Sequence, residues 1–326
     1  MKIRSLVSLI TTSALILSTG CSSLSKEPLS YTGTAFDTVI NIQIFDSDEP
    51  ELIENCKTIC QNYEEKFSRT IDTSEISKIN AAGGAPVEVS DETVQIINKG
   101  IYYGKMSNGA FDITIGSLTS LWGFSDENAS VPSSEAISEA LKHVDYKNIV
   151  INDNYVQLLD PGAKLDLGGI AKGYIADRLK EYLEQEGVDH ALINLGGNIL
   201  AVGNKLDKSD FNIGIQNPKN SNGEPITTIT LNDQSVVTSG NYQRYFEQNG
   251  EKYHHLLDPK TGYPSNNGLN SVTIITNSSL TADALSTTCF VLGPERGMKL
   301  VNQLDNVEAV FIDSNNEITY SRNFSH

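Results

Sequence analysis

The chain has 326 residues, enough for one large domain or two closely associated lobes. Hydrophobic residues make up 39% and charged residues 20%, which is typical of a globular protein and not of a disordered or fibrous one. The net charge of −17 disfavours electrostatic docking on nucleic acid or anionic lipid headgroups. An anionic ligand would therefore need a local source of positive potential, such as a helix N-terminus, a few basic residues or a bound cation.

The first thirty residues have the features of an export signal followed by a short tether. Lys2 and Arg4 give a basic start, and the apolar stretch up to Leu17 is shorter than the ~20 residues of a membrane-spanning helix. Small residues then lead into Cys21, which resembles the lipobox of bacterial lipoproteins, although Leu17 lies one place further from the cysteine than is usual. The expected organisation is a signal peptide at 1–20, a tether at 21–30 and a globular domain at 31–326.

A lipid such as palmitate on Cys21 would hold the protein at the extracytoplasmic face of a bacterial cell membrane. Ordinary secretion with an incidental cysteine is the alternative. Removal of the signal would leave 22 basic and 41 acidic residues, a net charge of −19. Such a domain is repelled by nucleic acid and by anionic headgroups, so any membrane attachment would depend on the lipid.

Beyond the tether, apolar periodicity predicts an alternation of helices and strands. Helices are expected at 52–67, 91–106, 132–141, 169–186 and 281–292. Strands are expected at 38–45, 149–151, 155–159, 191–195, 199–202, 211–215, 226–231, 271–276 and 307–312. No internal repeat, low-complexity run or clear linker divides this region, which indicates a single α+β domain of mixed sheets and helices.

Three further cysteines lie within the predicted helices. Cys56 and Cys60 are four residues apart on one helix, and Cys289 lies on another. The sequence lacks the paired C-x-x-C spacing of a zinc site. Free cysteines on apolar helix faces behave as small hydrophobic residues, so we expect buried thiols in preference to a disulfide.

The first candidate site is the glycine-rich entry into the helix expected at 169–186, from Asp166 to Gly173. Backbone N–H groups and the dipole at a helix start favour an anion, and Lys172 adds a positive charge in the first turn. Close packing of the helix against a sheet would need the same glycines. This motif alone leaves phosphate binding and packing equally open.

The second candidate site lies between residues 239 and 262. Arg244 could meet a phosphate through its planar fork of donors, and a histidine could transfer a proton. His254 and His255 would point to opposite faces of a strand, so at most one can face a site. Asp258 begins a plausible turn, and each of these side chains could also lie on the surface.

The third candidate site is on the last expected helix. Asp283 and Thr287 are four residues apart and therefore share one helix face. A carboxylate and a hydroxyl are hard oxygen ligands suited to Mg²⁺, which leaves room for a substrate phosphate. Alternatively, Asp283 could simply complement the dipole at the helix N-terminus.

A fourth, weaker signal follows the helix expected at 91–106. Phe111 and Asp112 lie in a probable loop there, with Ala110 before them. The pair could stack on a planar ring and hydrogen-bond it, but a lone Phe-Asp pair says little.

Taken together and in order, these motifs resemble the ApbE family, the FAD:protein FMN transferases. The resemblance runs from about Tyr31 to the C-terminus, and eight short strings in the same order make it specific although each is weak alone. The strings span residues 32–34, 74–80, 109–112, 166–173, 195–198, 239–246, 255–262 and 282–287.

The resemblance implies an enzyme that takes FAD as substrate, cleaves its pyrophosphate with the help of Mg²⁺, and releases AMP. FMN is attached to a threonine, or sometimes a serine, of an exported target flavoprotein. The side chains implied to line the FAD pocket are Ala110, Phe111, Asp112, Asp166, Lys172 and Leu257.

The resemblance also assigns the remaining site residues. Asp283, Thr287 and the carbonyl of Gly169 would hold Mg²⁺, with Ser286 as an outer participant. His255 matches a histidine often considered catalytic in the family, and His255 or a nearby carboxylate would take the proton of the acceptor hydroxyl. Two further FAD contacts are expected, from Thr32, where relatives commonly carry Met, and from Arg244.

Two other functions use the same pocket. Water in place of the acceptor hydroxyl would make the protein an FAD pyrophosphatase that yields FMN and AMP. A lipoprotein that only stores or delivers FAD would need the flavin pocket but not Asp283, Thr287 and Mg²⁺.

Overall fold

The computed structural model describes residues 27–124, 126, 129–220 and 223–325. The predicted signal peptide and Cys21 lie outside these residues. Strand β1 (Leu29–Ala35) pairs with β2 (Thr38–Ile44) from its first residue, so Leu29 and Ser30 belong to the sheet and not to the tether. Within the described part of the chain, no helix combines the length and apolar character needed to cross a membrane.

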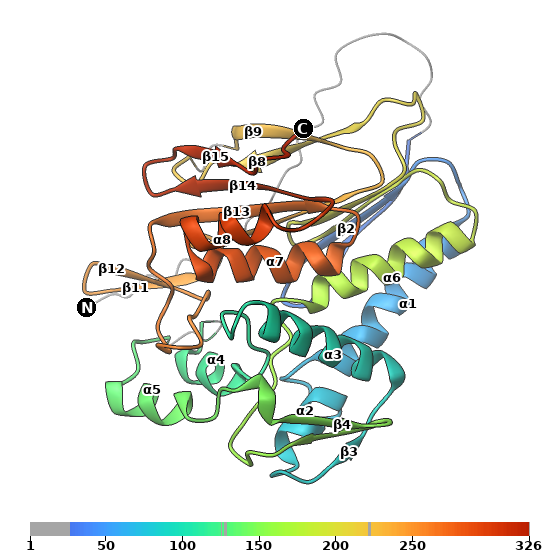
Figure 1. Ribbon diagram of the computed structural model, residues 1–326. Helices are drawn as coiled ribbons and strands as arrows, with labels where there is room; N and C mark the ends of the chain where they lie inside the picture. The colour runs from blue at the N-terminus through green and yellow to red at the C-terminus, as the bar shows by residue number, and fades with distance from the viewer. Residues whose placement is uncertain (1–26, 125, 127–128, 221–222, 326) are drawn as a thin grey trace.

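One large antiparallel sheet organises the upper part of the molecule in Figure 1. Alternation explains how its strands bury one face; in β2, for example, Ile40, Ile42 and Ile44 are buried. After β1 and β2, the order across the sheet is β6 (Ala191–Leu195), β7 (Asn198–Val202), β10 (Ser235–Gly240), β13 (Leu269–Thr276), β14 (Val307–Asp313) and β15 (Ile318–Tyr320).

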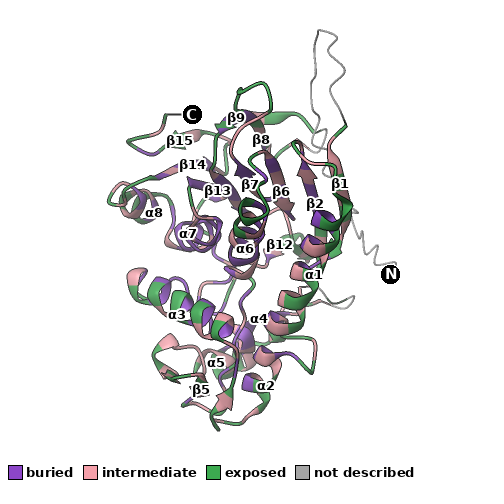
Figure 2. Ribbon diagram, turned by 90° about the vertical axis from the view of Figure 1, so that its right-hand side faces the viewer, coloured by how far each residue is buried: buried purple, intermediate pink, exposed green. Residues whose placement is uncertain are grey.

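Helices cover one face of this sheet, and a strand pair covers the other. The helices, which lie in a row in Figure 2, are α1 (Pro50–Phe67), α6 (Ala171–Gln185), α7 (Ser279–Leu292) and α8 (Pro294–Val301). On the opposite face, β8 (Phe211–Gln216) and β9 (Pro225–Leu231) contribute Phe211, Ile229 and Leu231 to a second hydrophobic cluster. Helix α7 is buried along nearly its whole length, which is typical of a helix enclosed on all sides.

A smaller lobe lies below the helical layer in Figure 1. Its elements are α2 (Glu75–Ala81), β3 (Val87–Glu88), α3 (Asp91–Met106), α4 (Gly116–Trp122), α5 (Ser134–Leu141), η1 (Tyr146–Asn148), β4 (Ile149–Asn152) and β5 (Tyr155–Leu158). A separate hairpin, β11 (Tyr245–Gln248) and β12 (Glu251–His254), reaches this lobe, where Phe246 and Tyr253 lie against Trp122.

The α+β class and most predicted elements are confirmed. Helix α3 has the predicted bounds, and Cys56, Cys60 and Cys289 are buried free thiols as expected. The helix predicted from residue 169 begins at Ala171 instead, because Gly169 and Ile170 form the turn that leads into it.

Several elements were not predicted. They are β1, α2, β3, α4, η1, β10, β11, β12, α8 and β15. Most are short, but β10 lies in the middle of the large sheet. The serines and threonine of β10 obscure the apolar signal of a buried strand, and two of those serines face α7.

Candidate active site

The glycine-rich entry into α6 lies directly against α7. Gly173 packs so closely on the first turn of α7 that a Cβ at this position would overlap the carbonyl oxygen of Ser279. The backbone N–H of Gly173 donates to Oδ2 of Asp283 at 2.9 Å. The packing interpretation therefore holds for Gly173, and this close approach also brings the start of α6 to a carboxylate on α7.

Asp283 is a buried carboxylate with one oxygen facing Lys172. Its side chain is only 4% exposed, and Oδ1 lies 3.6 Å from Nζ of Lys172, too far for a hydrogen bond. The ammonium of Lys172 also donates to the carbonyl of Gly168 at 3.2 Å. Lys172 thus stands between the glycine-rich entry and Asp283.

The alternative that Asp283 only complements the dipole of α7 does not fit its position. Ser278 caps the helix by accepting from the N–H of Thr281. The carboxylate of Asp177 on α6 accepts from the N–H groups of Ser279 and Leu280. These groups accept from the first N–H groups of α7. Asp283 lies one turn further along the helix and is not needed as their acceptor.

A chain of hydroxyls continues from Asp283 along α7 to β10. Ser286 donates to the carbonyl of Asp283 at 2.9 Å. Ser239, at the end of β10, lies 2.8 Å from the hydroxyl of Ser286 and 3.2 Å from that of Thr287. Ser239 appeared in the sequence only as the first residue of a longer string, and its contact with two α7 hydroxyls could not be read from spacing.

The oxygens around Asp283 fit a small hard cation. Gly169 adjoins Thr287, since a Cβ on Gly169 would lie 3.5 Å from Oγ1 of Thr287. The described residues contain no group of three or more His, Cys, Asp or Glu side chains that could hold a metal. A hydroxyl and a backbone carbonyl would therefore have to complete the set with Asp283, which suits Mg²⁺, since that ion binds few protein ligands and keeps the rest for water or phosphate.

The loop after α3 brings an aromatic ring to the same place. A Cβ on Gly169 would lie 3.1 Å from Cε2 of Phe111, so the ring edge closes over the glycine-rich entry. Phe111 and Ala110 are both buried, and Phe111 meets Tyr103 edge to face.

Asp112 is engaged within the protein. Its Oδ1 accepts from the N–H and hydroxyl of Thr114, and its Oδ2 accepts from the N–H of Tyr146 at 2.9 Å. Burial raises the pKa of this carboxyl, which these hydrogen bonds partly offset. The side chain of Asp112 thus ties the Phe111 loop to η1.

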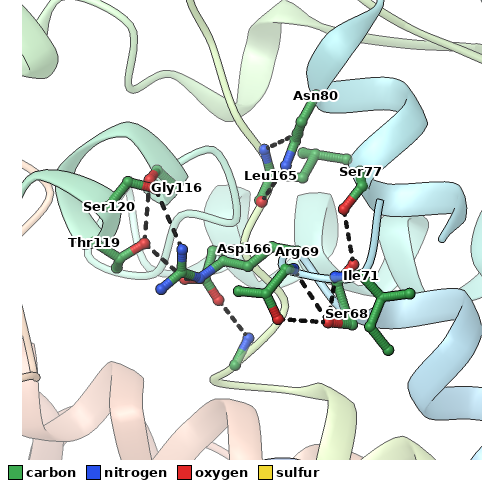
Figure 3. Close-up of polar contacts among 12 residues, drawn as sticks. Ser68, Arg69, Ile71, Ser77, Asn80, Gly116, Thr119, Ser120, Leu165 and Asp166 are labelled. Atoms are coloured by element: carbon green, nitrogen blue, oxygen red, sulfur yellow. Dashed lines mark hydrogen bonds and ion pairs between the residues drawn. The ribbon is translucent and has the colours of Figure 1, made fainter. Parts of the chain in front are cut away.

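Asp166 is also fixed by several partners (Figure 3). Oδ2 accepts from Thr119 at 2.7 Å and lies 3.1 Å from Nε of Arg69. Oδ1 accepts from the N–H of Gly168 at 2.8 Å. Arg69 was not predicted as a site residue, because no motif connects it with a residue almost a hundred positions away.

Arg244 and His255 lie on the side of the site formed by the β11–β12 hairpin. Arg244 is exposed and donates to the carbonyl of Asp37, in the turn between β1 and β2, at 2.9 Å. Nδ1 of His255 lies 3.2 Å from the carbonyl oxygen of Arg244. A carbonyl can only accept, so this contact requires the proton on Nδ1 and leaves the lone pair on Nε2.

The two histidines differ in environment, and only His254 lies within β12. His254 is buried edge-on to Phe290, and burial lowers its pKa to about 4. His255 is partly exposed, but loss of solvation of its ring among protein atoms lowers its pKa to about 3. The positive charges of Arg244 and, more weakly, Lys172 lower this pKa further. The effect of Lys172 links His255 to the same site.

Two other predicted FAD contacts have protein partners of their own. Leu257 is buried with Leu118, Trp122 and Ile137 in a small hydrophobic cluster. Thr32 is exposed on β1, where its hydroxyl accepts from Asn41 at 2.9 Å. The structure thus brings together Phe111, Gly169, Lys172, Asp283 and Thr287.

The sequence of the chain matches the model of the ApbE family over residues 36–311. The chain belongs to the ApbE family. The match to ApbE includes the site residues from Ala110 to Thr287 and begins after Thr32.

Related proteins support the ApbE assignment over most of the chain. A FAD:protein FMN transferase from Klebsiella pneumoniae is 38% identical over 90% of this chain and 91% of its own length. One from Treponema pallidum is 37% identical over 80% of this chain and 76% of its own length.

Solved structures show the same ApbE fold. The ApbE protein from Thermotoga maritima superposes with a TM-score of 0.84 at 36% identity, covering 91% of this chain and 97% of that one. The apo form of the flavinyl transferase ApbE from Pseudomonas stutzeri gives a TM-score of 0.81 at 30% identity, covering 91% and 95%.

Proposed function

We propose that this ApbE protein is an FAD:protein FMN transferase that attaches FMN to a threonine or serine hydroxyl of an exported target flavoprotein and releases AMP. The observation that carries the proposal is the meeting of the glycine-rich entry of α6 with the buried Asp283 of α7. Relatives bearing this activity in their names, at 37–38% identity, support it independently.

The reaction exchanges a phosphoanhydride bond for a phosphoester bond at the phosphorus atom that carries riboflavin. The acceptor hydroxyl oxygen bonds to this phosphorus, the bond to the bridging pyrophosphate oxygen breaks, and AMP leaves with that oxygen. The hydroxyl proton passes to a base. Positioning and charge stabilisation provide most of the catalysis in such a transfer.

The residues of the site suit a pyrophosphate. Asp283, Thr287 and the carbonyl of Gly169 would hold Mg²⁺, which when bound neutralises charge on the phosphates. Lys172 lies within reach of the same region and can pair with a phosphate oxygen once a cation meets Asp283. A very acidic protein can bind FAD in this way because the positive charge is local.

His255 is the proposed base. Its Nε2 carries the lone pair, and the ring is neutral at pH 7 because its pKa is lowered to about 3. A bound pyrophosphate beside it would raise that pKa, since a nearby negative charge favours the imidazolium, and this would make Nε2 a better proton acceptor.

We also propose that the protein acts at the extracytoplasmic face of a bacterial membrane, held there by a lipid on Cys21. A tethered enzyme would meet exported redox proteins where they mature. Mass spectrometry of the membrane fraction tests this, since a diacylated N-terminal peptide beginning at Cys21 is expected and an unmodified secreted chain would contradict it.

The enzymatic proposal is tested by incubating the protein with FAD, Mg²⁺ and a candidate acceptor, followed by intact-mass analysis. An acceptor that gains the mass of an FMN group, with AMP released in equal amount, supports transfer. AMP release without an adduct would make the protein a pyrophosphatase. Tight FAD binding without either product would make it a flavin-binding lipoprotein.

A further inference from the structure

Arg69 connects the linker between α1 and α2 to the glycine-rich entry of α6 (Figure 3). Its Nε lies 3.1 Å from Oδ2 of Asp166, and its Nη1 donates to Ser120 of α4 at 3.3 Å. The same carboxylate oxygen accepts from Thr119 of α4. Three segments that are distant in sequence therefore meet on the carboxylate of Asp166.

The contacts of Asp166 continue to the site. Its other oxygen accepts from the N–H of Gly168, and the carbonyl of Gly168 accepts from Lys172. Lys172 in turn faces Asp283 at 3.6 Å. Gly168 is thus held through its N–H by Asp166 and through its carbonyl by Lys172, so the orientation of Asp166 can affect the placement of Lys172.

The backbone near these residues has its own anchors, so Arg69 is not needed to keep it in place. Asn80 of α2 exchanges two hydrogen bonds with the backbone of Leu165, at 2.9 and 2.6 Å. The hydroxyl of Ser68 accepts from the N–H of Ile71, and the carbonyl of Ser68 accepts from Ser77. A salt bridge whose arginine is one-third exposed adds little to folding stability by itself.

We propose that Arg69 is a positioning residue for FAD binding, which holds the carboxylate of Asp166 and through it the turn at Gly168 and the ammonium of Lys172. This inference rests on the proposed function, because it takes the glycine-rich entry as the place where FAD binds. Arginine suits the task because its rigid fork can contact Asp166 and Ser120 at once, whereas lysine offers a single point charge.

A double-mutant cycle on FAD binding tests the proposal. Arg69→Ala should weaken FAD binding about tenfold, the size expected for a lost charge-assisted hydrogen bond. Asp166→Ala should weaken it at least as much, and Arg69→Ala should add almost nothing in the Asp166→Ala background. The dissociation constant is measured by calorimetry on the purified full domain with Mg²⁺ present.

Two further variants separate positioning from folding and from bulk charge. Arg69→Lys should recover only part of the affinity, because it keeps the charge but loses the fork. Lys66→Ala removes a neighbouring positive charge that pairs with Glu92 at 3.1 Å, and should leave FAD affinity within about twofold, as expected of an exposed pair. Melting temperatures of all variants should lie within a few degrees of the parent.

In the transfer reaction, Arg69→Ala should raise the KM for FAD while kcat changes less than KM. Unchanged FAD affinity in Arg69→Ala, or independent and additive losses in the double variant, would overturn the role of Arg69. The binding cycle needs no turnover, so a protein that binds FAD without transferring FMN would contradict the proposed function and leave this test intact. Absence of FAD binding in the parent protein would overturn both.

Discussion

The two sides of the site are built differently. On the α6–α7 side, Asp283 is buried, and backbone and hydroxyl groups fix the residues around it. On the side of the β11–β12 hairpin, Arg244 is exposed and His255 keeps part of its surface. Charged groups in a dry, preorganised setting act more strongly than in water, so the first side suits the pyrophosphate and the second suits an acceptor protein that must enter.

The largest effect on FMN transfer is expected from a substitution of Asp283. In Asp283→Asn the amide oxygen can still accept from Gly173, so packing is retained while the negative charge is lost. We expect FMN transfer to fall by about three orders of magnitude, since the cation would lose the only charged side chain among its proposed ligands. The measurement is the initial rate of adduct formation by intact mass, with Mg²⁺ binding followed separately by calorimetry.

A rate for Asp283→Asn close to that of the parent protein would remove Asp283 from the metal site. The melting temperature provides the control, because an unchanged value shows that the loss of rate is not a loss of fold.

On the hairpin side, His255→Gln should reduce the rate of transfer about 100-fold if His255 is the base, the lower end of the range for general base catalysis. FAD affinity should change little, because the imidazole is neutral in the free protein. The rate should be compared with that of His254→Gln, since His254 is buried against Phe290. A full rate in His255→Gln would assign the proton to another group.

Ser239 tests whether a residue that contacts a proposed Mg²⁺ ligand, without being a ligand, affects Mg²⁺ binding. Ser239→Ala removes the contacts with Ser286 and Thr287, and residues that orient metal ligands typically contribute about 10–100-fold to metal affinity. We expect a weakening of Mg²⁺ binding in this range, measured by calorimetry. Thr238→Val is the matched control, because the neighbouring Thr238 pairs with Thr273 instead. An equal loss of Mg²⁺ affinity in the two variants would show that Ser239 does not orient the Mg²⁺ ligands.

The smallest effect concerns the stability of the hairpin side towards acid. Burial lowers the pKa of His254 from 6.5 to about 4, so the unfolded chain takes up the proton more readily. The free energy of unfolding should therefore fall as the pH drops from 6.5 towards 4, by roughly 2 kcal/mol for this residue at pH 4.5. His255 acts in the same direction.

His254→Gln should make stability depend less on pH in this range. Urea unfolding of the two proteins at pH 7 and pH 4.5 measures the difference, and the parent should lose more stability than the variant. Equal losses would show that His254 is not held neutral in the folded protein.

Local patterns predicted most of the fold. Helix α3 was predicted with its observed bounds, and the alternation of Ile40, Ile42 and Ile44 identified a strand of the large sheet. Strand β10 was missed because Ser235 and Ser239 take the place of apolar residues and pair with α7 hydroxyls. A local propensity that fails is expected where a functional site requires polar side chains inside the protein.

The site was predictable where its residues share one element. Spacing along a single helix placed Asp283 and Thr287 on one face of α7. The role of Gly173 in packing and the contact between Arg69 and Asp166 depend on how separate elements meet, which no local pattern contains.

The most direct test of the account is a paired reaction of the parent protein with FAD and an acceptor flavoprotein, with Mg²⁺ or with a chelator, followed by intact-mass and AMP measurements. The acceptor is expected to gain one FMN group for each AMP released with Mg²⁺, and both products are expected to disappear with the chelator. Adduct formation that is unaffected by the chelator, or AMP release without an adduct, would contradict it.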